Sequence, residues 1–135
     1  MDYRTVLTTC TYCGCGCNFF LEVLDGEIID TIPCKTSPVN EGKLCIKGWN
    51  VHEFVQSERR LTGPLVRKEG ELVPVSWDEA LDYTASRLKT ICEDSGPDSI
   101  GFFASAKVTN EENYLLQKFA RAAVGTNNVD HCARL

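Results

Sequence analysis

Residues 10–17 read Cys10-Thr-Tyr-Cys13-Gly-Cys15-Gly-Cys17, which places four of the eight cysteines of the chain in one short segment. A fifth cysteine, Cys45, follows later in the chain, just before Lys47 and a glycine. Cysteines so close in sequence rarely reach disulfide geometry, but they converge easily on one metal centre. The glycines between them permit the unusual backbone angles with which amide groups turn toward such a centre. The segment therefore predicts a metal site.

The spacing of these cysteines favours a [4Fe–4S] cluster. Cys10, Cys13 and Cys17 stand at x2 and x3 spacing, which suits three corners of a cubane, and Cys45 is the distant fourth ligand. A structural zinc site with four cysteine ligands is the alternative, although such sites usually draw their ligands from two CxxC pairs. The motif of a two-cluster ferredoxin does not fit, because it needs a cysteine where a glycine stands. Cys15 is an alternative to Cys17 as the third ligand.

Length and composition indicate a soluble globular protein. The chain has 135 residues, enough for one domain or for a small domain joined to part of another. Apolar residues make up 43% and charged residues 24% of the sequence, which is not the composition of a disordered chain. The net charge of −5 argues against a nucleic-acid partner. No apolar run approaches the roughly 18 residues that a membrane span requires, so we expect none.

The N-terminal residues predict a cytoplasmic protein. Residues 1–9 contain no apolar signal region, and the pair Arg59-Arg60 lies too deep in the chain for a twin-arginine export signal. Disulfides are rare in a reducing compartment, where a dense cysteine cluster indicates metal binding or redox chemistry instead. Cys34 and Cys92 are interpreted as a loop thiol and as a small apolar residue on a helix.

Residues 1–60 predict a small, loop-rich domain built on β-hairpins. Residues 4–9 read as a strand, and residues 18–24 and 27–32 as a hairpin around Asp25-Gly26. A polar loop follows over residues 33–43, and a short helix is expected over residues 49–57. Such a unit has few apolar residues to bury, so a bound cluster would stabilise it.

Residues 61–135 predict the beginning of an α/β domain with a parallel sheet. A hairpin is expected over residues 65–68 and 71–75, and Ser76 and Glu79 form a capping box that opens a helix ending at Gly96-Pro97. A strand over residues 99–104, a helix over residues 111–124 and a strand from residue 127 follow. These elements cannot complete a sheet, so we expect a truncated domain. The fold class is therefore α+β, a [4Fe–4S] domain followed by an incomplete α/β domain.

The cysteine pattern resembles the N-terminal signature of the molybdopterin oxidoreductases grouped with dimethyl sulfoxide reductase. That signature is C-x2-C-x3-C, about 27 residues, and then C-x-K-G. Four further segments narrow the resemblance to cytoplasmic formate dehydrogenases, namely residues 74–81, 105–114, 117–121 and 125–134. The resemblance covers essentially the whole chain. It implies the reversible oxidation of formate to carbon dioxide at molybdenum or tungsten, held by two molybdopterin guanine dinucleotides.

The resemblance also implies roles for single residues. Cys10, Cys13, Cys17 and Cys45 would hold the [4Fe–4S] cluster. Lys47 corresponds to the lysine between the cluster and one pterin, where it would serve electron transfer and pterin binding; the alternative is a solvated lysine beside a glycine turn.

Four further positions receive roles from the same resemblance. Lys107 stands where formate dehydrogenases carry a basic residue near the active site. Cys132 and Arg134 would shape the surroundings of the metal ligand, and His131 is interpreted as a structural neighbour rather than a general base. Cys15 departs from the pattern of the family, which commonly has a small or apolar residue there.

In that family the metal ligand, selenocysteine or cysteine, comes directly after the segment that ends here at Leu135. We therefore expect selenocysteine at position 136 and no catalysis by residues 1–135 alone. The implied partners are the remainder of the catalytic subunit and an electron-accepting iron–sulfur, flavin or hydrogenase subunit. The alternatives are a free-standing [4Fe–4S] electron-transfer protein and another molybdopterin oxidoreductase, such as an assimilatory nitrate reductase. The choice of metal, the electron acceptor and the direction of the reaction stay open.

Overall fold

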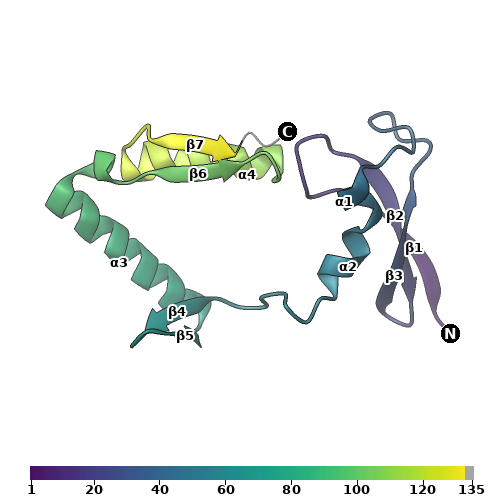
Figure 1. The fold of residues 1–135 in the computed structure, drawn as a ribbon, viewed down its shortest axis with the longest axis horizontal. Helices are drawn as coiled ribbons and strands as arrows, with labels where there is room; N and C mark the ends of the chain where they lie inside the picture. Colours follow the sequence, from purple (N-terminus) through teal and green to yellow (C-terminus); the bar gives the residue numbers. More distant parts are fainter. Residues whose placement is uncertain (133–135) are drawn as a thin grey trace. The chain divides into compact units, whose positions relative to one another are not determined.

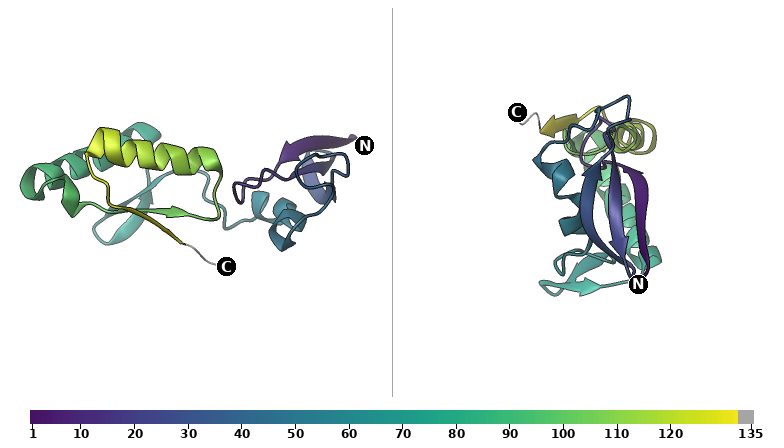
Figure 2. Two further views of the ribbon diagram at one scale, coloured as in Figure 1. Left: turned by 90° about the horizontal axis from the view of Figure 1, so that it is seen from above. Right: turned by 90° about the vertical axis from the view of Figure 1, so that its right-hand side faces the viewer.

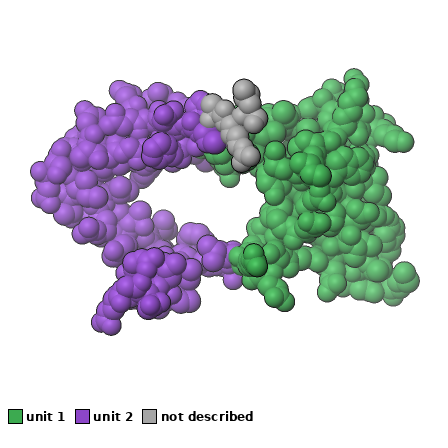
Figure 3. Space-filling view, in the orientation of Figure 1, with its two compact units in different colours: residues 1–60, 105–113, 133–135 green, residues 61–104, 114–132 purple. Residues whose placement is uncertain are grey.

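The computed structural model describes residues 1–132, which form two compact units (Figure 3). The N-terminal unit comprises residues 1–60 and 105–113, and the second unit comprises residues 61–104 and 114–132. Arg134 and Leu135, which the sequence singles out, lie outside the described residues. Within residues 1–132, no helix is long and apolar enough to cross a membrane.

The N-terminal unit is built on an antiparallel three-stranded sheet in the order β1-β2-β3 (Figure 1). Its strands are β1 (Tyr3–Thr9), β2 (Asn18–Leu24) and β3 (Glu27–Pro33). Asp25 and Gly26 both have positive φ angles, of 49° and 93°, at the tight turn between β2 and β3. Such a turn matches the twist of the two strands it connects. The predicted hairpin is confirmed.

Two short helices follow the polar loop, α1 (Ile46–Trp49) and α2 (Val51–Val55). The single helix predicted over residues 49–57 is wrong, since helical structure begins three residues earlier and is interrupted at Asn50. The side-chain amide of Asn50 donates a hydrogen bond of 2.7 Å to the carbonyl oxygen of Ile46. A side chain that binds the backbone of its own turn competes with the regular helical bonds, and this explains the break.

The core of the N-terminal unit is small and includes one of the predicted cluster ligands. Phe19 of β2 packs against Cys10 and Val51, and all three are buried. Tyr12 and Phe54 pack against the same core from the cysteine loop and from α2. The beginning of the cysteine loop is therefore anchored to the sheet and to a helix by apolar contacts.

The second unit opens with the hairpin of β4 (Leu65–Lys68) and β5 (Glu71–Pro74), followed by the long helix α3 (Trp77–Ser95). The Glu79 N–H donates to the Ser76 hydroxyl at 3.2 Å, which is the predicted N-cap. The other half of the predicted capping box is wrong. The Glu79 carboxylate accepts a hydrogen bond of 2.6 Å from Lys68, because the β4–β5 hairpin brings that ammonium group alongside.

The remaining elements are η1 (Pro97–Ser99), β6 (Phe102–Ser105), α4 (Asn110–Lys118), the π-helical η2 (Phe119–Val124) and β7 (Val129–Cys132). Strands β6 and β7 pair and run in the same direction (Figures 1 and 2). The expected strand at residue 99 begins later, because the turn after Pro97 is a 3-10 helix. Small antiparallel sheets followed by a parallel pair confirm the predicted fold class.

Candidate metal centre

The cysteine loop is the connection between β1 and β2. Strand pairing ends at Thr9 and Asn18, and the Cys10 N–H then donates a hydrogen bond of 2.8 Å to the Cys17 carbonyl oxygen. Two predicted ligands thus stand at the two ends of a closed loop. Gly16 within it has a φ of 70°, which a residue with a Cβ adopts only under strain.

Cys45 reaches this loop through a connection that sequence reasoning missed. Asn40 is buried, and its side-chain oxygen accepts from the Asn18 N–H at 2.9 Å. Its amide group donates to the carbonyl oxygens of Asn18 and Lys43, both at 3.1 Å. The segment that leads into Cys45 is therefore tied to the start of β2, directly after Cys17. An asparagine in a polar loop gives no sequence signal for this role.

Cys45 is held at the start of α1, where backbone amides favour its thiolate. Its contact with the Gly48 N–H does not meet the geometry of a regular capping bond, yet that amide is the main cause that lowers the pKa of Cys45. The amide and the charge of Lys47 act in the same direction, and together they outweigh partial burial. Because iron binds the thiolate, this environment suits a metal ligand.

The other thiols of the loop lie close enough to influence one another. The pKa of Cys17 is raised by burial and by the neighbouring thiolates of Cys10, Cys13 and Cys45. The pKa of Cys15 is raised by a hydrogen bond with Cys13 and then by the charges of Cys13, Cys17 and Cys45. The structure therefore brings the four predicted ligands together, and Cys15 joins them.

A zinc ion and an iron–sulfur cluster place different demands on four thiolates. In residues 1–132, no three cysteine, histidine or acidic side chains converge closely enough to hold one metal ion. A tetrahedral zinc ion needs its sulfur ligands about 2.3 Å from one point. A cubane takes one thiolate at each iron, so its four sulfur ligands stand farther apart.

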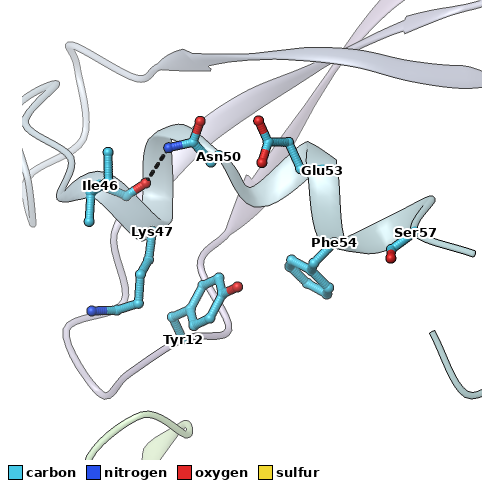
Figure 4. Close-up of a pocket in the computed structure, with 7 residues that line it drawn as sticks. All are labelled: Tyr12, Ile46, Lys47, Asn50, Glu53, Phe54 and Ser57. Atoms are coloured by element: carbon cyan, nitrogen blue, oxygen red, sulfur yellow. Dashed lines mark hydrogen bonds between the residues drawn. The ribbon is translucent and has the colours of Figure 1, made fainter. Parts of the chain in front are cut away.

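Lys47 is half-buried and lines an open groove of about 570 Å³ beside the cysteine loop (Figure 4). Tyr12 of the loop and Phe54 of α2 form part of its wall, with their rings edge to face at 5.5 Å between centroids. The groove combines one cation with two aromatic rings. Because the Glu53 carboxylate also lines the groove, this surface offers charged groups of both signs beside aromatic rings, which suits a flat polar molecule.

Three other residues singled out by sequence, Lys107, His131 and Cys132, are exposed. Lys107 lies in the turn between β6 and α4, and His131 and Cys132 lie in β7. Cys34, interpreted as a loop thiol, is buried just after β3, and its sulfur lies 3.5 Å from the Thr36 hydroxyl. No disulfide joins any of the cysteines within residues 1–132.

A second contact that sequence reasoning missed involves the start of α4. The side-chain amide of Asn110 donates a hydrogen bond of 3.1 Å to the carbonyl oxygen of Gly14. A sequence signal for the helix start was present, because Thr109 and Glu112 form a capping box. The Glu112 N–H binds the Thr109 hydroxyl at 3.3 Å, and the Glu112 carboxylate accepts from the Thr109 N–H at 2.7 Å. Helix α4 therefore begins one residue before the predicted residue 111.

Comparison with known families accounts for both parts of the chain. Residues 3–57 match the molybdopterin oxidoreductase Fe4S4 domain, and residues 60–135 match the molybdopterin oxidoreductase family. The chain belongs to the molybdopterin oxidoreductases. The expected resemblance is confirmed, and with it the [4Fe–4S] cluster and the pterin as the cofactors of this family.

Several curated relatives, each named a formate dehydrogenase, are similar over nearly all of the chain. It is 54% identical over 134 residues to F420-dependent formate dehydrogenase 2 subunit alpha of Methanococcus maripaludis, which is 99% of this chain and 19% of that protein. It is 52% identical over its whole length to the corresponding subunit of Methanocaldococcus jannaschii, again 19% of that protein. A putative formate dehydrogenase of Staphylococcus aureus is 50% identical over 94% of the chain and 13% of its own length. The chain thus spans about a fifth, or less, of these relatives.

Acetylene hydratase from Pelobacter acetylenicus is a solved structure of similar fold. The TM-score is 0.71 at 28% sequence identity, and the match covers 93% of this chain and 18% of that one. An experimentally determined structure therefore has the same order of hairpins, helices and parallel strands as this chain.

Proposed function

We propose that this chain is the N-terminal iron–sulfur part of a formate dehydrogenase. In this role it passes electrons between a pterin-bound molybdenum or tungsten site and an external acceptor, during the reversible oxidation of formate to carbon dioxide. The observation that carries the proposal is that Cys45, at the start of α1, lies near the loop that holds Cys10, Cys13 and Cys17. This arrangement occurs in a chain that is 52–54% identical, along its length, to formate dehydrogenase alpha subunits.

We assign Cys10, Cys13, Cys17 and Cys45 as the ligands of the cluster. Cys10 is fixed by the apolar core, Cys17 by the closure of the loop, and Cys45 by its place at the start of α1. Cys15 is left out of the assigned set because it departs from the C-x2-C-x3-C spacing, although its thiol lies near Cys13 and Cys17. The cluster supplies one-electron transfer when it is bound.

Lys47 would act on both the cluster and the pterin. Its positive charge lowers the pKa of Cys45, and by the same interaction it stabilises the added electron of a reduced cluster. Its place in the groove with Tyr12 supports a direct contact with a pterin. Lys107, exposed in the turn before α4, is proposed as a further basic residue near the substrate.

The proposal assigns a role to each part of the sequence. Residues 1–60 would form the cluster-binding domain and residues 61–135 the beginning of the pterin-binding α/β domain. The family matches, which change over between residues 57 and 60, support this division. Partners would be the remainder of the catalytic subunit and an electron-accepting subunit, and the F420-dependent relatives favour F420 as the final acceptor. A cytoplasmic location is proposed as well, because a reducing compartment keeps cysteine ligands from forming disulfides.

The cluster is tested on the 135-residue chain, produced and handled without oxygen. Four iron and four sulfide per chain, with a paramagnetic signal after reduction, are expected for a [4Fe–4S] centre. Replacing Cys45 by serine should remove most of the iron, whereas Cys92→Ser, a thiol on α3, should keep it. Stoichiometric zinc in place of iron, or equal iron in both variants, would contradict the assignment.

The activity is tested on the native protein, captured from its source with an antibody against the chain. Formate-dependent reduction of a viologen dye is expected, together with molybdenum or tungsten in the captured sample. Nitrate reduction in place of formate oxidation would favour the nitrate reductase alternative. A captured polypeptide of 15.0 kDa with iron but without molybdenum or tungsten would favour a free-standing electron-transfer protein.

A further inference from the structure

The first residue of α4 touches the cysteine loop across 96 positions of sequence. The amide nitrogen of Asn110 donates a hydrogen bond of 3.1 Å to the Gly14 carbonyl oxygen. Gly14 stands between two of the proposed cluster ligands, and both partners belong to the N-terminal unit. The contact therefore joins the cluster loop to the segment that carries Lys107.

Position 14 requires a glycine because of this contact, and not because of its own backbone conformation. Its φ angle is not positive, unlike that of Gly16, so a residue with a side chain would meet no backbone strain there. A Cβ at Gly14, however, would lie 2.9 Å from Cγ and 3.1 Å from Nδ2 of Asn110. Real Cβ atoms do not approach a neighbour so closely, and the side chain of Asn110 would have to move. The absence of a side chain at Gly14 is what admits the asparagine.

Asn110 is itself held in place by the capping box at the start of α4. Thr109 and Glu112 bind each other's backbone N–H groups on either side of it. The backbone of the helix start is therefore fixed, and it presents the Asn110 side chain to the loop. Two mutually supporting features, a capped helix and a glycine with space beside it, produce one hydrogen bond.

The hydrogen bond fixes the plane of one peptide group in the loop. In a trans peptide the carbonyl of one residue and the N–H of the next point in opposite directions. With the Gly14 carbonyl held toward α4, the N–H of Cys15 points away from that helix. Hydrogen bonds from backbone amides to the sulfur atoms are among the factors that set the potential of an iron–sulfur cluster.

We propose that Asn110 is a positioning residue for the [4Fe–4S] cluster. By holding the Gly14 carbonyl, it fixes the direction of the Cys15 amide within the cysteine loop and so influences the potential of the cluster. The inference rests on the proposed function, because it requires that the four cysteines bind the cluster.

The test compares single and double variants of the full chain under anaerobic conditions. Asn110→Ala removes the donor, Asn110→Asp keeps the shape but can only accept, and Gly14→Ala displaces the side chain while leaving Asn110 in the sequence. Asn113→Ala is the matched control, because the amide of Asn113 lies on the same helix and donates to the Ser105 carbonyl oxygen. Iron content, the midpoint potential from a reductive titration, and the rate of iron loss to a chelator are measured for each.

The expected result is a shift without loss of the cluster. Iron content stays at the wild-type value, while Asn110→Ala, Asn110→Asp and Gly14→Ala each shift the midpoint potential in the same direction. Each also speeds iron loss about two- to tenfold, as the loss of one hydrogen bond implies. The double variant of Gly14 and Asn110 behaves like either single variant, because both remove the same contact.

Other results overturn the inference in distinguishable ways. A wild-type chain without iron sinks the proposed function and the inference together. The positioning role alone is contradicted if both Asn110 variants keep the wild-type iron content and an unshifted midpoint potential, as expected for Asn113→Ala. Additive effects of Gly14→Ala and Asn110→Ala would show that the two residues act separately.

Discussion

Phe19 is the residue whose truncation should most affect the N-terminal unit. Its side chain is only 1% exposed, and it packs in the centre of the core against Cys10 and Val51. Replacement by alanine leaves a cavity between β2, α2 and the start of the cysteine loop. We therefore expect Phe19→Ala to lower both the free energy of unfolding and the retention of the cluster.

The size of this effect follows from the buried area. A fully buried aromatic ring removes about 150–250 Å² from water, worth about 4–6 kcal/mol at roughly 25 cal/mol per Å². The unfolded chain already buries some of that area, and alanine keeps the Cβ, so about 3–5 kcal/mol is expected. A unit of about 60 residues has a total stability of about 3–9 kcal/mol at the usual value per residue. The substitution should therefore remove a large part of it.

The measurement is urea unfolding followed by the fluorescence of Trp49, which lies in α1 of the same unit. A Trp77→Phe background silences the other tryptophan, which is 66% exposed and lies in the second unit. Phe103→Ala is the matched control, because that ring is 85% exposed, and it should change stability by less than about 0.5 kcal/mol. A loss below about 1 kcal/mol for Phe19→Ala, or an equal loss in both variants, would refute the reasoning.

Three further outcomes are expected. In the chain without its cluster, Cys45 should react with iodoacetamide faster than Cys15 near pH 8. An amide of α1 lowers the pKa of Cys45, whereas a hydrogen bond with a neighbouring thiol raises the pKa of Cys15. The reverse order of reaction, measured by peptide-resolved mass spectrometry, would contradict this prediction. Chelation of the iron should lower the melting temperature of the N-terminal unit, since metal binding contributes to folding, and an unchanged calorimetric transition would argue against this. Ser76→Ala should destabilise α3 by about 1 kcal/mol in urea unfolding through loss of its N-cap, whereas the exposed Ser86→Ala should not.

The elements that depend on neighbours in sequence were predictable. Asp25-Gly26 and Glu69-Gly70 each form the expected turn, and all four residues have positive φ angles. The cap at Ser76 and the end of α3 at Gly96 also follow local rules. In each case the deciding interaction spans only a few residues, so the local sequence alone specifies it.

The errors lie where a distant or competing partner intervenes. The helix expected over residues 49–57 is broken by the side chain of Asn50. Glu79 binds Lys68 of the preceding hairpin and not the amide of its own cap. The apolar spacing of α3 correctly predicted a helix, but none of its residues is buried in the described structure, and Leu81 is 60% exposed. The spacing of apolar residues predicts the helix, but it does not predict what covers the apolar face of that helix.

The sequence by itself predicted a metal site, because the spacing of Cys10, Cys13, Cys17 and Cys45 limits which metal centre four thiolates can hold. Only the tertiary structure decided how they meet. The segment before Cys45 is tied to the end of the loop by Asn40, which binds Asn18, 22 positions away, and the loop itself is bound by Asn110 across 96 positions of sequence. A hydrogen bond between residues so far apart depends on the folding of everything between them, and the side chain of a single asparagine carries no trace of its partner in the sequence.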